Sequence, residues 1–172
     1  MSALSRFRNR LIAKVITRFP ALAKHFIDAY TPWESEDIPW TPLRKPLSES
    51  TIAIVTTAGV HHRDQGPFDM NDPHGDPSYR VIDATRPLTD LMITHDYYDH
   101  TDADKDINII FPVDRLRELA EQKVIGALAK KHYSFMGHIE GPHVITLMTK
   151  TAPEVARMLK EDDADAVLLT PG

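Results

Sequence analysis

The stretch "TIAIVTTAGV" at positions 51–60 decides the fold class of this chain. It joins apolar and β-branched residues without interruption and ends in a turn of small residues. A continuous apolar run of this length indicates a strand that is covered on both faces, as in a parallel sheet. Further strands are predicted at "YRVID" (79–83), "INIIF" (107–111), "HVITLM" (143–148) and "DAVLLT" (165–170).

Two helical patterns lie among the predicted strands. "PVDRLRELAEQ" (112–122) and "TAPEVARMLKE" (151–161) carry apolar residues at helical spacing, and the second opens with Thr151 and Pro153, which are typical of a helix start. Strands that alternate with helices are typical of α/β folds. We therefore expect an α/β domain over residues 51–172, with a Rossmann-like, mostly parallel sheet flanked by helices.

Two segments precede this domain. Residues 1–30 form an N-terminal amphipathic helical segment, in which Pro20 predicts a kink and no acidic residue comes before Asp28. Its basic face suits an anionic membrane, a partner, or simply solvent if the helix packs on its own domain. Residues 31–50 carry four prolines and both tryptophans, which predicts an extended connector.

The composition excludes several classes of protein. A net charge of -5 argues against general nucleic-acid binding, which needs a basic surface. No run approaches the ~20 apolar residues of a membrane span, so we expect no transmembrane segment. The absence of cysteine removes thiolate sites from the residues present and fits a cytoplasmic location.

Residues 61–106 differ from the rest of the chain, because they hold eleven aspartates and five of the nine histidines. In open α/β sheets, ligands bind where the strands deliver their carboxyl ends. His61 and His62 directly follow the first predicted strand, and Asp69 lies in the long loop after it. This loop is therefore either a ligand-binding loop or polar surface.

"THDYYDHTDADKD" (94–106) invites two metal hypotheses. A calcium loop is rejected, because Ile107 stands where a turn glycine is needed and Val113 where a bidentate glutamate is needed. His95, Asp99 and His100 resemble the H-x-H-x-D-H motif of metallo-β-lactamase-like hydrolases, with Tyr97 replacing the second histidine. A metal-dependent hydrolase therefore stays as an alternative, beside a loop whose polar residues only cap and bridge.

"KKHYSFMGHIEGPH" (130–143) adds His132 and Ser134, which line either a pocket wall or a packed corner. No phosphate-binding glycine motif and no nucleophile elbow occurs in the sequence. The spacing arguments thus predict an α/β domain with a face rich in histidine and aspartate, without a complete catalytic set.

Several longer motifs resemble the selenoprotein B family of glycine/betaine/sarcosine/D-proline reductases, especially its short single-domain members. They are "IPWTPLRKPLSESTIAIVTTAGVHH" (38–62), "GPFD" (66–69), "GDPSYRVI" (75–82), "DINIIFPVDRLRELAEQKVIGALAKKHYSFMGHI" (106–139) and "DADAVLLTP" (163–171). The resemblance covers about residues 38–171, and residues 1–30 contribute little to it.

The resemblance implies an oxidoreductase that cleaves a carbon–nitrogen bond reductively. A selenocysteine or cysteine attacks the α-carbon of the substrate, and a dithiol or thioredoxin-like reductant restores the enzyme. In the family this residue lies in a loop resembling T-P-x-(Sec/Cys)-x-x-Cys, to which Thr170, Pro171 and Gly172 correspond. We therefore expect the nucleophile just after Gly172, with a selenocysteine codon read as stop and a C-terminally truncated fold; a degenerate or deliberately truncated member is the alternative.

The resemblance also implies a substrate-pocket shell. It firmly implies no cofactor beyond selenocysteine in the full-length form, and no residue is assigned as a metal ligand. The shell residues are His61, His62, Asp69, His95, Asp99, His100, Asn108, His132, Ser134 and Thr170. Their expected roles are to bind the substrate and to transfer protons, since histidine titrates near neutrality. Expected partners are a small-molecule substrate, a thiol-redox protein and a second copy of the chain at an unpaired sheet edge. The non-enzymatic alternative is a ligand-binding or regulatory subunit.

Overall fold

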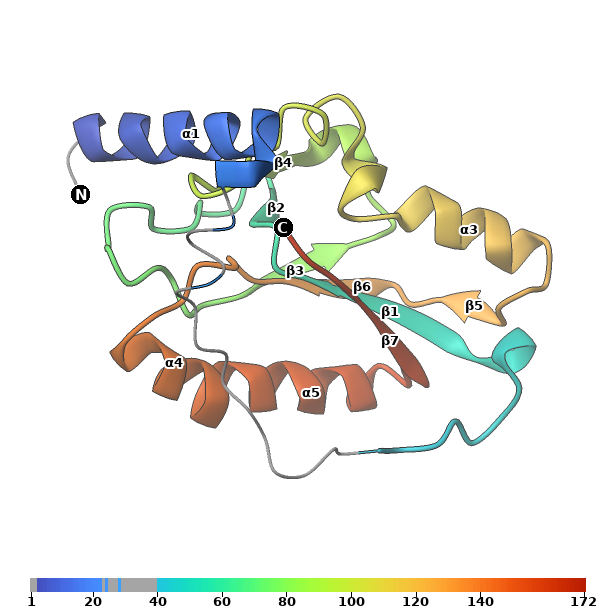
Figure 1. Cartoon of the computed structure of the whole chain (residues 1–172). Coiled ribbons are helices and arrows are strands. Elements are labelled where there is room, and N and C mark those ends of the chain that lie inside the picture. The colour runs from blue at the N-terminus through green and yellow to red at the C-terminus, as the bar shows by residue number, and fades with distance from the viewer. Residues whose placement is uncertain (1–2, 23, 25–27, 29–39) are drawn as a thin grey trace.

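The computed structural model describes residues 3–22, 24, 28 and 40–172, and its centre is strand β1 (Thr51–Thr56). β7 (Ala166–Thr170) pairs with β1 in parallel along one edge. The short strands β5 (Ala127–Leu128) and β6 (Lys131–Ser134) follow each other along the opposite edge, also parallel to β1. β3 (Arg80–Asp83) completes the sheet antiparallel to β6 (Figure 1). The result is a mixed sheet in which every partner of β1 is parallel to it.

Helices cover both faces of this sheet (Figure 1). α3 (Val113–Glu121) lies on one face. α4 (Pro142–Thr146) continues through a π-helical turn (Leu147–Thr151) into α5 (Ala152–Glu161) on the other. On the α3 side, β2 (Val60–His62) and β4 (Leu91–Ile93) form a small antiparallel sheet, and α1 (Ala3–Arg18) lies beyond it (Figure 1). The prediction of an α/β fold is confirmed at this level.

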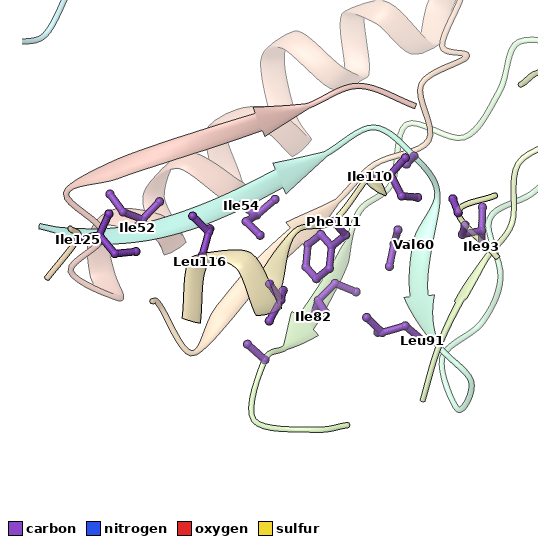
Figure 2. Close-up of a cluster of buried hydrophobic side chains, with 14 residues drawn as sticks. Ile52, Ile54, Val60, Ile82, Leu91, Ile93, Ile110, Phe111, Leu116 and Ile125 are labelled. Carbon is purple, nitrogen blue, oxygen red and sulfur yellow. The ribbon is translucent and has the colours of Figure 1, made fainter. Parts of the chain in front are cut away.

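Two apolar clusters hold the helices on the sheet, because successive side chains of β1 point to opposite faces. Ile54 points toward α3 and packs with Ile82, Phe111 and Leu116 (Figure 2). On the other face, the buried residues are Ala53, Ala129, Tyr133, Phe135, Val155 and Leu159. Burial of β1 on both sides explains why its sequence is apolar at nearly every position.

Two predicted strands are wrong. Residues 107–111 contain a 3₁₀ turn, Ile107–Ile109, whose start is capped by the side chain of Asp106 accepting from the amide of Asn108. Residues 143–148 are helical, because Gly141 and Pro142 start a helix directly before them. A short apolar run does not distinguish a strand from a buried helix, and the flanking residues decided against a strand in both places.

The two predicted helices of the domain are confirmed as α3 and α5, whereas β2, β4, β5 and β6 were not predicted. These four strands are two to four residues long, too short for an alternating pattern to be visible. In the N-terminal segment, α1 ends at Arg18 and a 3₁₀ turn spans Pro20–Leu22, as the proline predicts. Most of that predicted helix after Leu22, and residues 31–39 of the predicted connector, fall outside the described residues. In the described part of the connector, a 3₁₀ turn spans Leu47–Glu49.

Candidate functional site

The carboxyl ends of the parallel strands meet at the turn formed by Thr57, Ala58 and Gly59. The amide of Thr57 donates to the carbonyl of Thr170 over 3.0 Å, which joins the turn to the end of β7. The amide of Gly59 donates to the carbonyl of Phe135 over 2.9 Å, which joins it to the residue after β6. This turn is therefore the place where a ligand is expected in an open α/β sheet.

Gly172 reaches the same turn. Its amide donates to Oγ1 of Thr57 over 3.2 Å, and a Cβ at this position would approach Cα of Ala58 to 2.3 Å. Only a glycine can come so close to the backbone of the turn. The side-chain oxygen of Thr170 is buried nearby, without a hydrogen-bond partner among the described residues.

The loop 94–106 reaches the turn from the other direction. Gly59 has a φ of +71°, and a Cβ on it would lie 2.4 Å from the carbonyl oxygen of Thr94, so this contact also requires glycine. The amide of Thr94 donates to the carbonyl of Gly59 over 2.9 Å, and the hydroxyl of Tyr98 donates to the carbonyl of Ala58 over 3.0 Å. His95 thereby becomes a direct neighbour of the turn.

His95 is the most deeply buried histidine of this loop, with 4% of its surface exposed. Its Nδ1 accepts from the amide of Tyr97 over 3.1 Å, and its Nε2 has no hydrogen-bond partner among the described residues. Burial lowers the pKa of His95 to about 4, so the ring is neutral at neutral pH. Since Nδ1 is the acceptor, the proton sits on Nε2, and His95 offers one unused donor.

A cavity of about 340 Å³ lies over this loop, between it and α1. Among the side chains that line it are Arg6, Arg10, Lys14, His95, Asp99 and His100. Two of these lining residues, Arg6 and Arg10, form ion pairs with Asp96, whose side chain is fully buried. Oδ2 of Asp96 lies 2.5 Å from Nε of Arg6, and Oδ1 lies 2.6 Å from Nε of Arg10. α1 is thus fastened over the predicted site by its inward-facing arginines.

The charge of Asp96 is preserved by the same contacts. Burial by itself would raise its pKa, but hydrogen bonds from Arg6 and Arg10 hold the pKa of this carboxyl below its usual value. Because Arg6 and Arg10 are four residues apart, one face of α1 presents both guanidinium groups to the same carboxylate.

Asp99 and His100 line the cavity but bond within their own loop. Asp99 accepts from the amide and hydroxyl of Thr101, and Nδ1 of His100 lies 2.8 Å from a carboxylate oxygen of Asp104. In the part of the chain that the structure describes, no group of three or more histidine, aspartate or glutamate side chains is arranged to hold a metal ion. The arrangement therefore gives no support to the metal-dependent hydrolase.

His61 and His62 are both buried in β2 but face different neighbours. Nε2 of His61 lies 2.8 Å from the hydroxyl of Thr94, directly before His95. His62 accepts from the amide of Asp83 and lies 3.4 Å from a carboxylate oxygen of Asp90, away from the turn. Burial lowers the pKa of both rings, which leaves them neutral at neutral pH.

Four other predicted shell residues have structural partners. His132 is fully buried and accepts from the amide of Ile54, and burial lowers its pKa to about 4. Ser134 is fully buried beside it in β6, and its hydroxyl donates to the carbonyl of Phe135. Asn108 bonds to Asp106 and to Asp114 at the start of α3. Asp69 is exposed in its loop and accepts from the amide of Asn71.

A second cavity, of about 560 Å³, lies on the α4 side of the same turn. Its lining is mainly apolar and includes Thr57, Met136, Gly137, Val144 and Met148. Thr57 therefore borders this cavity while its hydroxyl contacts Gly172. The turn separates a polar cavity under α1 from an apolar one beside α4.

Sequence reasoning missed Arg6, Arg10, Asp96, Thr57 and Tyr98. The i,i+4 arginine pair was visible, but its partner Asp96 is 86 residues from Arg10, and no local pattern links them. No sequence motif indicated Tyr98 either, because its hydroxyl bonds to the backbone of a turn that is distant in the sequence.

Comparison with known proteins places the chain in a family. A family model described as glycine/sarcosine/betaine reductase selenoprotein B matches residues 9–172. The chain belongs to this family. No solved structure matches it.

Named relatives are subunits of reductases. The chain is 44% identical to the D-proline reductase subunit gamma of Acetoanaerobium sticklandii over 133 residues, which is 77% of this chain and 53% of that protein. It is 33% identical to the glycine reductase complex component B subunit gamma of Symbiobacterium thermophilum, covering 77% of this chain and 31% of that protein. It is 30% identical to the sarcosine reductase complex component B subunit beta of Peptoclostridium acidaminophilum, covering 77% and 30%. The chain thus spans about half or less of each relative's length.

Proposed function

We propose that this chain forms the substrate-binding part of a selenoprotein B-type reductase, which cleaves a carbon–nitrogen bond of a small molecule or carries out related thiol or selenol redox chemistry. The family membership supports the reaction class, and the relatives' names indicate glycine, sarcosine and D-proline as first substrates to test. A Rossmann-like topology, a cytoplasmic location and a dithiol or thioredoxin-like reductant belong to the same proposal.

The position of Gly172 is the observation that carries the proposal. The family resemblance expects the redox residue directly after this glycine, and its amide is bonded to Thr57 at the carboxyl ends of β1 and β7. A selenolate or thiolate directly after Gly172 would follow a residue that is bonded to this turn, which also contacts Thr94 and Tyr98. It would bond to the α-carbon while the carbon–nitrogen electron pair leaves with the amine, which takes up a proton; two electrons from a dithiol then release the reduced product.

The buried histidines are not suited to act as acids that protonate the leaving amine. His95, His61 and His132 are buried and neutral, so none of them is an imidazolium that could keep a selenolate ionised. His95 instead has a proton on Nε2 without a partner, which suits a hydrogen bond to a bound substrate. We assign His95 to substrate orientation, and the leaving amine takes its proton from another donor.

The test extends the polypeptide beyond Gly172 with the residues encoded after it, carrying selenocysteine or cysteine at the next position. Incubation with a dithiol and each of glycine, sarcosine, betaine and D-proline should release amine, or the ring-opened product from D-proline. The same polypeptide with serine at that position should be inactive, because a hydroxyl is not ionised near neutrality. In the active form His95→Gln should lower kcat/KM at least ~10-fold, whereas exposed His74→Gln should not.

Absence of activity on all four substrates, despite a folded protein with the selenol or thiol present, would contradict the reductase proposal. Retained binding of a small ligand by the 172-residue form would then favour the ligand-binding or regulatory subunit. DNA without an open reading frame after the Gly172 codon would also favour that second function.

A further inference from the structure

α1 turns its apolar residues away from the domain. Ala13 is its only buried residue. The exposed apolar side chains continue into the following turn and are Leu4 (77%), Phe7 (66%), Leu11 (51%), Ile12 (42%), Val15 (39%), Phe19 (59%) and Leu22 (53%). A helix on the surface of a globular domain normally directs this stripe to the core. An exposed apolar surface of this kind marks an interaction site.

The inward face of α1 explains how the helix is held without those residues. Arg6 and Arg10 bond to the buried carboxylate of Asp96, and Ala13 and Ile16 lie over Tyr97 and Tyr98. Because these contacts fasten α1 to the domain, its apolar stripe remains available to another surface.

Basic residues accompany the stripe. Arg8, Lys14 and Arg18 are exposed, and α1 carries five basic residues and no acidic one. The remaining sequence has 15 of the 20 basic residues and all 25 acidic ones. The positive charge is thus concentrated on the helix that also exposes the apolar side chains.

We propose that α1 docks on the surface of an anionic lipid bilayer. Leu4, Phe7 and Leu11 enter the boundary between headgroups and acyl chains. Arg8 and Arg18 reach the lipid phosphates. At 16 residues the helix is about 24 Å long, which suits lying in the interface. No described helix is long and apolar enough to cross a membrane.

Lipid fits this face better than a protein partner does. At the helical period of 100° per residue, Arg8 and Arg18 fall among the exposed apolar positions rather than on the opposite side. Long basic side chains can extend from such positions to phosphates, whereas the buried centre of a protein interface is depleted in charged residues. The acidic remainder of the chain is repelled by the same bilayer, which orients the molecule with α1 toward the lipid.

Flotation of the whole chain with vesicles tests this proposal, independently of the proposed catalytic function. Vesicles of phosphatidylcholine mixed with phosphatidylglycerol should bind the protein at least ~10-fold more tightly than pure phosphatidylcholine, and added salt should reduce the difference. Phe7→Ser together with Leu11→Ser should weaken binding at least ~10-fold, while Arg8→Gln with Arg18→Gln should weaken it only on anionic vesicles. Leu169→Ser is the matched control, because Leu169 is 72% exposed but lies on β7.

Because all of these substitutions are at exposed positions, each variant should stay folded, and its unfolding midpoint checks this. Failure to bind anionic vesicles, equal binding to both vesicle types, or loss of binding by Leu169→Ser alone would overturn the proposal. Self-association in lipid-free solution that disappears with Phe7→Ser and Leu11→Ser would overturn it as well, in favour of a second copy on this face.

Discussion

α1 and α5 are both amphipathic helices, yet they face their surroundings in opposite ways. α5 buries Val155 and Leu159 against Ala53 and Tyr133 of the sheet. α1 buries only Ala13 and is fastened by the ion pairs of Arg6 and Arg10 with Asp96. The same kind of sequence pattern therefore produces a helix that stabilises the core in one case and one that roofs a cavity in the other.

The difference shows that periodicity defines two faces of a helix but does not decide which face packs inward. Four residues separate the end of α5 from the start of β7. Because β7 belongs to the sheet, this short connection keeps α5 against the sheet. Among the described residues no strand follows α1 so closely, and a buried carboxylate in a distant loop orients this helix. The sheet region around α5 and the roof region, defined as α1 with the loop 94–106, should then respond differently to perturbation.

The largest expected effect is a loss of stability at low pH, to which one buried histidine of each region contributes. His132 in the sheet and His95 in the roof each have a pKa of about 4, below the usual 6.5, so the unfolded chain binds their protons more strongly. The contribution of the two neutral histidines to the free energy of unfolding is fully present above pH 6.5. It falls by about 3 kcal/mol for each histidine as the pH drops to 4. Urea unfolding at a series of pH values measures this loss.

Asparagine variants apportion the pH dependence. His132→Asn and His95→Asn should each flatten the dependence of stability on pH between pH 6.5 and 4. If the pH dependence of stability is unaltered in His95→Asn, the roof region opens to solvent before the sheet unfolds. The ascription of part of this dependence to the roof region would then be wrong.

The second effect compares matched leucines. Leu159→Ala in α5 removes a side chain that is 9% exposed and should lower the free energy of unfolding by about 2–4 kcal/mol. Leu11→Ala in α1 removes one that is 51% exposed and should change it by less than about 0.5 kcal/mol. Urea denaturation in lipid-free buffer measures both, and equal losses would show that α1 packs through its apolar stripe after all.

The smallest effect tests what fastens the roof. Asp96→Asn keeps the shape of the side chain but removes the charge that pairs with Arg6 and Arg10, and should destabilise the chain by about 1–3 kcal/mol. Asp102→Asn, in the same loop but 80% exposed, should have almost no effect. Hydrogen exchange should show faster exchange of the α1 amides in Asp96→Asn while those of β1 stay protected, and unchanged α1 exchange would contradict the assignment.

Much of the fold could be predicted from local sequence. β1, β3, β7, α3 and α5 all lie where apolar runs or helical spacing indicated them. The failures at 107–111 and 143–148 have a common cause, since a cap at Asp106 and the Gly141–Pro142 pair outweighed the strand preference of β-branched residues. The two- to four-residue strands could not be predicted, because they exist only through pairing with a neighbour.

The candidate site was predictable in its residue types but not in its assembly. The sequence placed His95, Asp99 and His100 together, and the structure puts all three in the wall of one cavity. His62, Asn108 and His132 belong to the same predicted shell, yet each is engaged in a structural bond elsewhere. A functional role for any of these residues remains a prediction that the extended polypeptide can test.

By itself, the sequence determined an α/β domain built on a doubly buried first strand, a basic amphipathic N-terminal helix and membership of a reductase family. These properties follow from local patterns and from motifs of contiguous residues. Tertiary structure alone decided that Gly172 bonds to Thr57, that Asp96 orients α1, and that the apolar face of α1 points outward. The reason is that burial, ion pairing and pKa depend on groups brought together from distant parts of the chain, which no local pattern contains.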